Sequence, residues 1–358
     1  MADNQVDHVD HVDRVDQVNE DFPRLADPFR RELLAHCYRM LGSVHDAEDL
    51  VQETYLRAWR AYDKFEGRSS MRTWLHRIAT NTCLDALESR SKRPLPTGLG
   101  GPSSDPTDTL VEQREVPWLE PVPDAMVGAD GADPAAIVTS RESIRLAFVA
   151  ALQHLPPRQR AVLLLRDVLK WRAAEVAELL DTTTVSVNSA LQRARAQVKE
   201  VSPSEDEVVE PTGPEQRELL ERYVAAFEEK DISVIVKLFA QDAVWEMPPF
   251  PGWYQGPQDI GQLVDTQCPA GPGDMRLIPT EMNGQPTFAV YMREQEGGDF
   301  RPFQLQVLTL SAAGLVCGQP SVSHVTAFFD LRLFEACGLP EVLPANGDVT
   351  GVGLYARS

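Results

Sequence analysis

The residues best suited to chemistry fall into two groups of different kinds. Amide, hydroxyl and guanidinium side chains can hydrogen-bond base edges and phosphates. They form a row of helical spacing that comprises Thr184, Ser186, Asn188, Ser189, Gln192 and Arg193. Glu246 and His324 form the second group, a carboxylate and an imidazole of the types used in acid–base catalysis. Neighbouring strand residues alternate faces, so Trp245 and Glu246 are not expected to enter one pocket together, which disfavours catalysis there.

Two short helical patterns in residues 173–195 position the first group. Val176, Ala177 and Leu180 form the inner face of one helix, and Val187 and Leu191 form that of the next. Asp181 occupies the turn, where glycine is easiest but aspartate tolerates a left-handed backbone. The pattern predicts a helix-turn-helix whose polar row faces a DNA groove, with a helical hairpin inside an ordinary bundle as the alternative.

A second basic and aromatic group lies on a helix expected near residues 70–89. Trp74 and Asn81 offer a stacking surface and a hydrogen-bonding amide, which suit unstacked bases. Trp74 shares its neighbourhood with Leu75, so a core position is the alternative. The phosphate contacts expected beside them are Arg72, Arg77, Arg90, Lys92 and Arg93.

The charge is distributed unevenly along the 358 residues. Averaged over the chain, the net charge of −20 argues against nucleic-acid binding. Residues 21–95 and 140–200, however, carry net charges of +2 and +4. These two basic islands are where nucleic-acid binding is expected. The five cysteines include no CxxC pair, and no signal peptide or membrane span is evident, so we expect a cytoplasmic protein without disulfides, metal or cofactor.

Composition and periodicity divide the chain into helical and mixed segments. Apolar spacing predicts all-α domains over 24–94 and 140–200, and helices followed by strands predict an α+β domain over 214–335. Asn283-Gly284 between two strand-like runs indicates a hairpin turn. The remaining segments are a disordered acidic tail (1–23), a flexible linker rich in Pro, Gly, Ser and Asp (95–139), an acidic linker (201–213) and a C-terminal tail (336–358).

The two basic islands resemble conserved regions of the sigma-70 superfamily. "DAEDLVQETYLRAWRAYDKF" (46–65) and "SSMRTWLHRIATNTCLDALESRSKRP" (69–94) resemble region 2. "LPPRQRAVLLLRDVLKWRAAEVAELLDTTTVSVNSALQRARAQV" (155–198) resembles region 4. No region 3 is recognisable between them, a feature of the extracytoplasmic-function (ECF) group, which includes a mycobacterial type with an extra C-terminal domain.

The resemblance implies partners and roles for these islands. Core RNA polymerase would bind an acidic helix through Asp46, Glu48, Asp49, Leu50, Gln52 and Glu53, for which a solvated helix face is the alternative. The helix at 70–89 would capture the melted −10 element, and residues 184–193 would read the −35 element. Asn188 and Ala190 stand where relatives often carry Lys or Arg, so the −35 preference cannot be copied from relatives.

One stretch of the linker has a composition typical of an ordered segment. Trp118, Leu119, Glu120 and Pro121 resemble a Trp-Leu-Pro-Glu-Pro-like motif of sigma factors that carry an extra C-terminal domain. An aromatic residue beside prolines is preorganised for docking in a groove. We interpret this stretch as a latch, with mere stiffening of the linker as the alternative.

Residues 214–335 resemble the SnoaL-like, cone-shaped α+β fold through "RELLERYVAAFEEKDISVIVKLFAQDAVWEMPPFPGWYQG" (217–256) and "SHVTAFFD" (323–330). Such cones are hollow, and the side chains expected to line the hollow are Trp245, Met247, Trp253, Tyr254, Gln304 and His324. A bound small ligand, protein contact and catalysis all remain open, as does an anti-sigma partner. The sequence predicts a non-enzymatic sigma factor; a ligand-controlled helix-turn-helix repressor and a DNA-binding cyclase explain fewer of its features.

Overall fold

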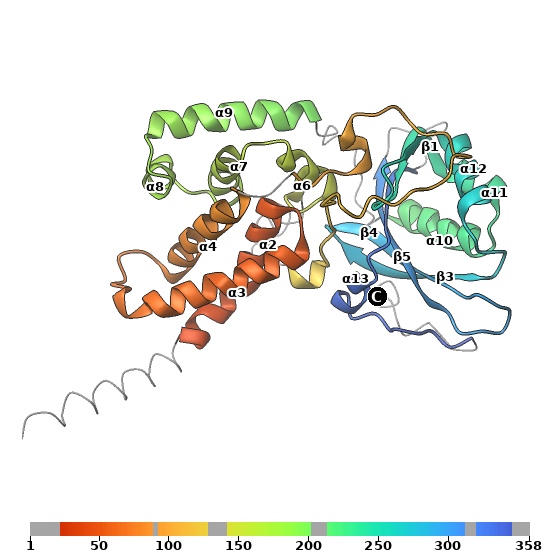
Figure 1. The fold of residues 1–358 in the computed structure, drawn as a ribbon, viewed down its shortest axis with the longest axis horizontal. Coiled ribbons are helices and arrows are strands. Elements are labelled where there is room, and N and C mark those ends of the chain that lie inside the picture. The colour runs from red at the N-terminus through yellow and green to blue at the C-terminus, as the bar shows by residue number, and fades with distance from the viewer. Residues whose placement is uncertain (1–21, 89–91, 128–141, 202–212, 312–319, 346–358) are drawn as a thin grey trace, which may run out of the picture. The chain divides into compact units, whose positions relative to one another are not determined.

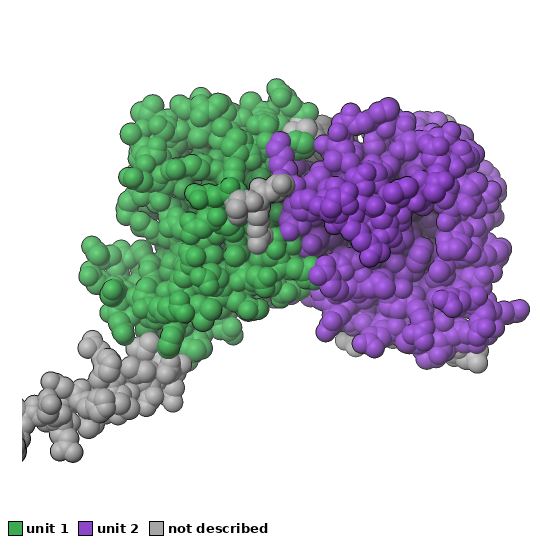
Figure 2. All heavy atoms as spheres, viewed as in Figure 1, with its two compact units in different colours: residues 1–91, 126–144, 151–200 green, residues 92–125, 145–150, 201–358 purple. Residues whose placement is uncertain are grey.

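The computed structural model describes residues 22–88, 92–127, 142–201, 213–311 and 320–345. The chain forms two compact units, shown in green and purple in Figure 2. Unit 1 comprises residues 1–91, 126–144 and 151–200, and unit 2 comprises residues 92–125, 145–150 and 201–358. Most of the acidic tail, Arg90 and residues 346–358 lie outside the described residues.

Unit 1 begins with three helices whose ends follow from local sequence. Ser43 and Ser70 cap the second and third helices by accepting hydrogen bonds from the backbone N–H groups of Asp46 and Thr73, both at 3.1 Å. The dipeptide Asp27-Pro28 has residue types that predict a helix N-cap and first turn, but Asp27 instead begins a 3-10 turn. The elements are η1 (Asp27–Phe29), α2 (Arg30–Leu41), α3 (Val44–Ala61), η2 (Tyr62–Lys64) and α4 (Met71–Leu87).

The second half of unit 1 contains the expected helix-turn-helix (Figure 1). Asp181 has a φ of +47°, the left-handed conformation predicted for it. Val176, Ala177, Val187 and Leu191 are buried, as the periodicity predicts. The elements are α6 (Leu146–Gln153), whose start belongs to unit 2, α7 (Pro157–Leu163), the π-helical turn η5 (Leu164–Val168), α8 (Ala173–Leu179) and α9 (Thr184–Val201).

Unit 2 contains a six-stranded sheet in the order β2-β1-β6-β5-β4-β3. All neighbouring pairs are antiparallel except β1 with β6. Asn283 and Gly284, with φ of +57° and +64°, form the predicted two-residue hairpin turn. The strands are β1 (Phe239–Glu246), β2 (Trp253–Gln255), β3 (Met275–Met282), β4 (Gln285–Met292), β5 (Arg301–Ser311) and β6 (Ser321–Phe328).

Helices cover one face of this sheet, where the apolar core of unit 2 lies (Figure 1). Tyr223 and Phe227 stack with centroids 4.4 Å apart, and Phe227 stacks on Trp245 at 5.9 Å. Strand β2 and helix α12 were not expected from the sequence. The helices are α10 (Pro214–Glu228), α11 (Ile232–Leu238), α12 (Pro257–Gln267) and α13 (Arg332–Ala336). Among the described helices, none is both long and apolar enough to cross a membrane.

Residues 92–125 pack against the domain of unit 2, although their composition predicts a flexible linker. Backbone hydrogen bonds join Ser104 to Trp253 (2.7 Å) and Gln113 to Pro249 (2.9 Å). Pro123 forms an isolated bridge with Met282. These backbone groups find distant partners that local composition cannot reveal. The segment contains the short turn η3 (Pro96–Leu99), and a second turn, η4 (Asp124–Met126), begins at its end.

Candidate functional site

The outward face of α9 presents the polar row identified in the sequence. Thr184, Ser186, Asn188, Gln192 and Arg193 are exposed, and Ser189 is half-buried. The opposite face buries Val187, Leu191 and Ala194. The α9 N-terminus is ordered by Thr183, whose hydroxyl accepts a hydrogen bond from the Ser186 N–H at 3.1 Å. The helix therefore presents amide and guanidinium groups in an arrangement that can read base edges.

Helix α4 presents fewer available cations than its sequence suggests. Arg72 donates two hydrogen bonds to Glu32, one of them at 2.9 Å. Burial opposes ionisation of Glu32, but the nearby imidazole of His76, at 3.4 Å, and the guanidinium of Arg72 outweigh it and lower the pKa of this carboxyl to about 2. Arg77 forms an ion pair with Glu178 at 2.9 Å, and both side chains remain substantially exposed. Such a surface pair is weak, so a phosphate can replace the carboxylate.

The groups expected to hold a melted base are placed differently. Asn81 is exposed on α4, whereas Trp74 is half-buried with its ring centroid 4.8 Å from that of Phe65. Lys92 and Arg93 belong to unit 2, and Arg93 donates to the backbone oxygen of Trp118 at 3.0 Å. Arg72, Trp74, Arg77 and Asn81 therefore share one helix in unit 1, but Lys92 and Arg93 are not part of that unit.

Helix α3 carries an exposed face that is both acidic and apolar. Asp49 and Gln52 are exposed; Asp46, Glu48, Leu50 and Glu53 are half-buried. Leu56 and Trp59, which periodicity assigns to the buried face, are 49% and 41% exposed. Leu56 and Trp59 are exposed because the face of α3 toward the core is already filled by other side chains. These are Val44, Ala47, Val51, Thr54 and Ala58. Large exposed apolar side chains beside carboxylates are typical of a protein-docking surface.

The latch residues of the linker are ordered in unit 2. Trp118 is 8% exposed, and its indole N–H donates to the backbone oxygen of Gln113 at 2.8 Å. Leu119 is fully buried and hydrogen-bonds Pro94 through its backbone, while Glu120 lies 3.7 Å from Arg93. Pro121 is also buried. The motif therefore has a packed position within this unit.

Two polar anchors, neither expected from the sequence, hold the linker against the sheet. The Val122 N–H donates to Asn283 Oδ1 at 2.9 Å, and the Asn283 N–H donates back to the Val122 oxygen at 3.0 Å. Thr97 donates to Glu246 Oε2 from its backbone N–H (3.0 Å) and its hydroxyl (2.9 Å). The Asn-Gly dipeptide signals its turn, but nothing in the sequence signals that its amide binds the linker.

Glu246 and His324 do come together, in a hydrogen-bonded group that also includes Thr97 of the linker. Glu246 is fully buried, and its Oε1 lies 2.7 Å from His324 Nε2 while its Oε2 accepts from Thr97. Burial opposes ionisation, but the charge and hydrogen bond of His324, with those of Thr97, hold the pKa of Glu246 below its usual value. Both carboxylate oxygens thus have protein partners.

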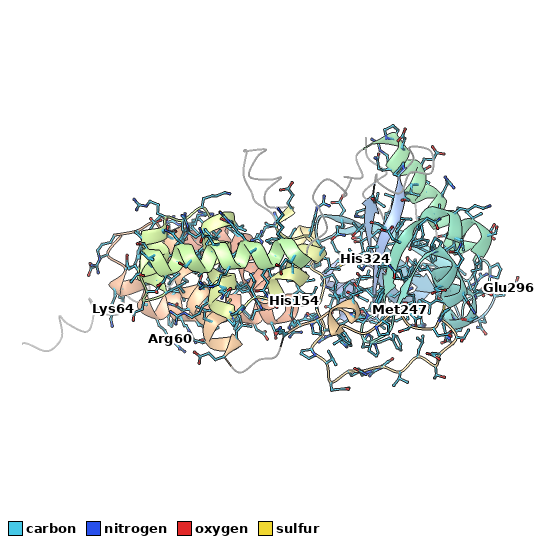
Figure 3. All side chains as sticks on the ribbon, turned by 90° about the horizontal axis from the view of Figure 1, so that it is seen from above. Arg60, Lys64, His154, Met247, Glu296 and His324 are labelled. Atoms are coloured by element: carbon cyan, nitrogen blue, oxygen red, sulfur yellow. The ribbon has the colours of Figure 1, made fainter. Side chains whose placement is uncertain are left out.

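A cavity of about 310 Å³ lies in unit 2. Of the six residues expected to line a hollow, Trp245, Met247 and Gln304 line this cavity. Trp253, Tyr254 and His324 do not; Figure 3 shows where Met247 and His324 lie in the unit. Trp245 faces the cavity and its neighbour Glu246 does not, as the alternation of strand residues predicts. The carboxylate–imidazole pair is therefore separate from the cavity lining.

Comparison with known families accounts for all three folded segments. Sigma-70 region 2 matches residues 25–93, sigma-70 region 4 matches 145–198, and the SnoaL-like domain matches 220–330. The ECF RNA polymerase sigma factor SigG of Mycobacterium tuberculosis is 62% identical over 326 residues, which span 90% of this chain and 85% of SigG. The chain belongs to the ECF sigma factors.

More distant ECF sigma factors extend the comparison. SigJ of M. tuberculosis is 31% identical over 220 residues, 61% of this chain and 62% of SigJ. The crystal structure of SigJ matches with a TM-score of 0.54 at 24% identity, covering 87% of this chain and 98% of that one, which shows a shared fold. This ECF sigma factor therefore combines regions 2 and 4, which serve promoter recognition, with a SnoaL-like domain. Sigma factors are in general not enzymes.

Proposed function

We propose that this sigma factor docks on core RNA polymerase through the outward face of α3. The exposed stripe of Asp49, Gln52, Leu56 and Trp59 is the observation that supports this role. Carboxylates favour approach to a basic partner, and the two apolar side chains supply area to bury. The resemblance to region 2 implies that this partner is the clamp helices of the largest polymerase subunit.

The promoter contacts in this proposal follow from exposure on two helices. Asn81 and Trp74 on α4 engage the melted −10 element, with Arg77 exchanging its carboxylate partner for a phosphate and Arg72 remaining paired with Glu32. Asn188, Gln192 and Arg193 on α9 enter the groove at the −35 element, where Asn188 pairs bidentately with adenine.

Two substitutions on α9 are expected to have different effects on −35 binding. Arg193→Ala removes a phosphate contact, so it should weaken binding of the polymerase holoenzyme to every −35 sequence and reduce the salt slope by about 1. Asn188→Ala should change base preference at one or two positions, by about 1–3 kcal/mol. The measurement is holoenzyme binding to a −35 library at two salt concentrations.

Lys199→Ala serves as the matched control, because Lys199 is an exposed cation near the end of the same helix. It should leave base preference unchanged. A uniform loss of the same size for Asn188→Ala and Arg193→Ala across the library would show that Asn188 does not read a base.

We propose further that the C-terminal unit modulates the sigma module instead of catalysing a reaction. The segment that joins regions 2 and 4 is anchored to the sheet by Thr97 on Glu246 and by Val122 on Asn283. A linker held in this way restricts where the two promoter-reading regions can lie. The pair Glu246 and His324 acts as an anchor, because Thr97 and His324 already occupy both carboxylate oxygens.

Releasing the linker is expected to raise transcription. Asn283→Gly keeps the left-handed turn but removes the acceptor for Val122, whereas Asn283→Asp keeps both. One hydrogen bond shifts the docking equilibrium by about three- to tenfold. At equal holoenzyme concentration, the Gly variant should give more transcript from one promoter and the Asp variant should match the wild type. Equal output from all three proteins would contradict the modulatory role.

A further inference from the structure

Helix α9 exposes a large apolar side chain among its polar ones. Val185 is 73% exposed, which exceeds the exposure of Leu56 and Trp59 on the outward face of α3. It lies in the first turn of α9, close to the connection from α8 (Figure 1). The polar row identified in the sequence omits this residue, because a valine side chain offers neither a hydrogen-bond donor nor an acceptor.

The side chain of Val185 takes no part in the core of unit 1. The core-facing side of α9 is filled by Val187, Leu191 and Ala194, all of which are buried. A β-branched residue also has a lower helix propensity than alanine, so an exposed valine slightly weakens the first turn of the helix. Neither burial nor helix propensity therefore accounts for this valine, whereas a contact made outside the fold would.

Val185 shares a face of α9 with residues expected to read base edges. Asn188, Ser189 and Gln192 follow it by three, four and seven residues, so the four side chains form one stripe along the helix. The stripe contains no charged group, which suits base edges better than phosphates. Arg193 lies beside the stripe and is left to contact a phosphate.

The first turn of α9 holds Val185 in a fixed orientation. The Thr183 hydroxyl donates to that of Ser186 at 3.0 Å and accepts from the Ser186 N–H at 3.1 Å. The backbone oxygen of Thr183 accepts from the Val187 N–H at 3.0 Å. A valine in a helix also occupies one side-chain rotamer in about 90% of cases. The γ-methyl groups of Val185 therefore lose little conformational entropy when they bind.

The major groove of DNA offers a matching apolar group. Thymine presents its C5 methyl group there, and proteins recognise this methyl by apolar contact with small side chains. The N-terminal residues of a recognition helix are the ones that contact base edges, and Val185 is the second residue of α9. Its position and its chemistry thus fit the same target.

We infer that Val185 reads the methyl group of one thymine in the −35 element and so selects a T·A pair at that position. The inference rests on the proposed entry of α9 into the groove and adds a residue that sets its specificity. Val185 and Asn188 are about 4.5 Å apart along the helix axis, slightly more than the roughly 3.4 Å between base pairs. With α9 along the groove, the thymine belongs to a base pair next to the one that Asn188 reads.

Replacing thymine by deoxyuridine tests this contact, because it removes the methyl group and leaves base pairing unchanged. The preferred −35 sequence is taken from the library, and each thymine on either strand is replaced in turn. The affinity of the polymerase holoenzyme is measured for each fragment. We expect a position at which the wild type binds thymine about two- to fivefold more tightly than deoxyuridine, the factor expected for burying one methyl group.

Substitutions at position 185 assign the preference to this side chain. Val185→Ala removes both γ-methyl groups and favours the helix, so it should remove most of the thymine preference at that position without unfolding α9. Val185→Ile keeps a β-branched apolar side chain and should preserve the preference. Val111→Ala is the matched control, because Val111 is 64% exposed but belongs to residues 92–125 of unit 2. It should retain the full preference.

The salt dependence separates this contact from a phosphate contact. An apolar contact with a methyl group releases no counterions, so Val185→Ala should keep the salt slope of the wild type. Arg193→Ala, which removes a cation from the same helix, should reduce that slope. A reduced slope in Val185→Ala would show that the substitution displaces the helix from the groove, and would overturn the assignment to a single methyl.

A thymine preference of the same size in wild type and Val185→Ala at every position would overturn the inference. An equal loss of the preference in Val185→Ala and Val111→Ala would overturn it as well. The proposed function fails in a different way, because holoenzyme binding would then be indifferent to the −35 sequence as a whole. A −35 preference that persists in Val185→Ala, with discrimination lost only between thymine and deoxyuridine at one position, is the result that we expect.

Discussion

Replacing Arg160 by methionine is expected to destabilise unit 1 by roughly 3 to 5 kcal/mol. Arg160 is 3% exposed and donates to Gln153 Oε1 at 2.8 Å, to the backbone oxygens of Gln153 and Leu155, and to that of Met40. Burial lowers the pKa of its guanidinium to about 10, so it stays charged at neutral pH. Methionine fills similar space but leaves these buried acceptors without donors.

The effect matters because Arg160 joins the two sigma regions within unit 1. Met40 lies at the end of α2, and Arg160 lies on α7. The loss of stability is measured by hydrogen exchange of peptides from α2 and α7 under increasing denaturant. Arg193→Ala, at an exposed position on α9, is the control and should leave exchange unchanged. Identical midpoints for wild type and Arg160→Met would show that these hydrogen bonds do not hold the unit.

Glu246→Gln is expected to cost unit 2 about 1–3 kcal/mol at neutral pH and to remove part of its acid sensitivity. The folded pKa of Glu246 lies below its usual value, because His324 and Thr97 outweigh the opposing effect of burial. Its stabilisation is therefore complete above the unfolded pKa, about 4.3, and is lost as the pH falls through the folded pKa. Glutamine has no charge to lose in this range.

The measurement is the free energy of unfolding of unit 2 from neutral pH down to the acid range. The wild type should lose stability steeply below about pH 4.3, and Glu246→Gln should show a shallower decline. Glu296→Gln is the control, since Glu296 is exposed at the far end of the unit in Figure 3. If both variants followed the wild-type curve, the buried carboxylate would not be the acid-sensitive group.

Local patterns predicted the elements whose signals are local. The helix expected near residues 70–89 begins after Ser70, which caps it through Thr73 three residues away, and Asn283-Gly284 forms its turn from its own backbone preferences. The polar row on α9 was predictable because a 3.6-residue period separates it from Val187 and Leu191. Short or irregular pieces such as β2, with three residues, give too few positions for a period.

What could not be predicted depends on partners distant in sequence. Thr97 and Glu246 are 149 residues apart, and Val122 and Asn283 are 161 apart. No local feature marks such pairs, so the linker looked flexible by composition. Leu56 and Trp59 show a different limit, because periodicity identifies apolar residues on a helix but not which apolar stripe faces the core.

Transcription by core RNA polymerase with and without this chain tests the central claim most directly. The same promoter library used for the α9 variants serves as template in a run-off assay. The account predicts that core polymerase alone starts at none of these promoters and that the added chain directs initiation at a subset sharing −10 and −35 sequences. Equal transcription in the two reactions, or binding of the chain to duplex DNA without polymerase, would contradict it and favour a repressor.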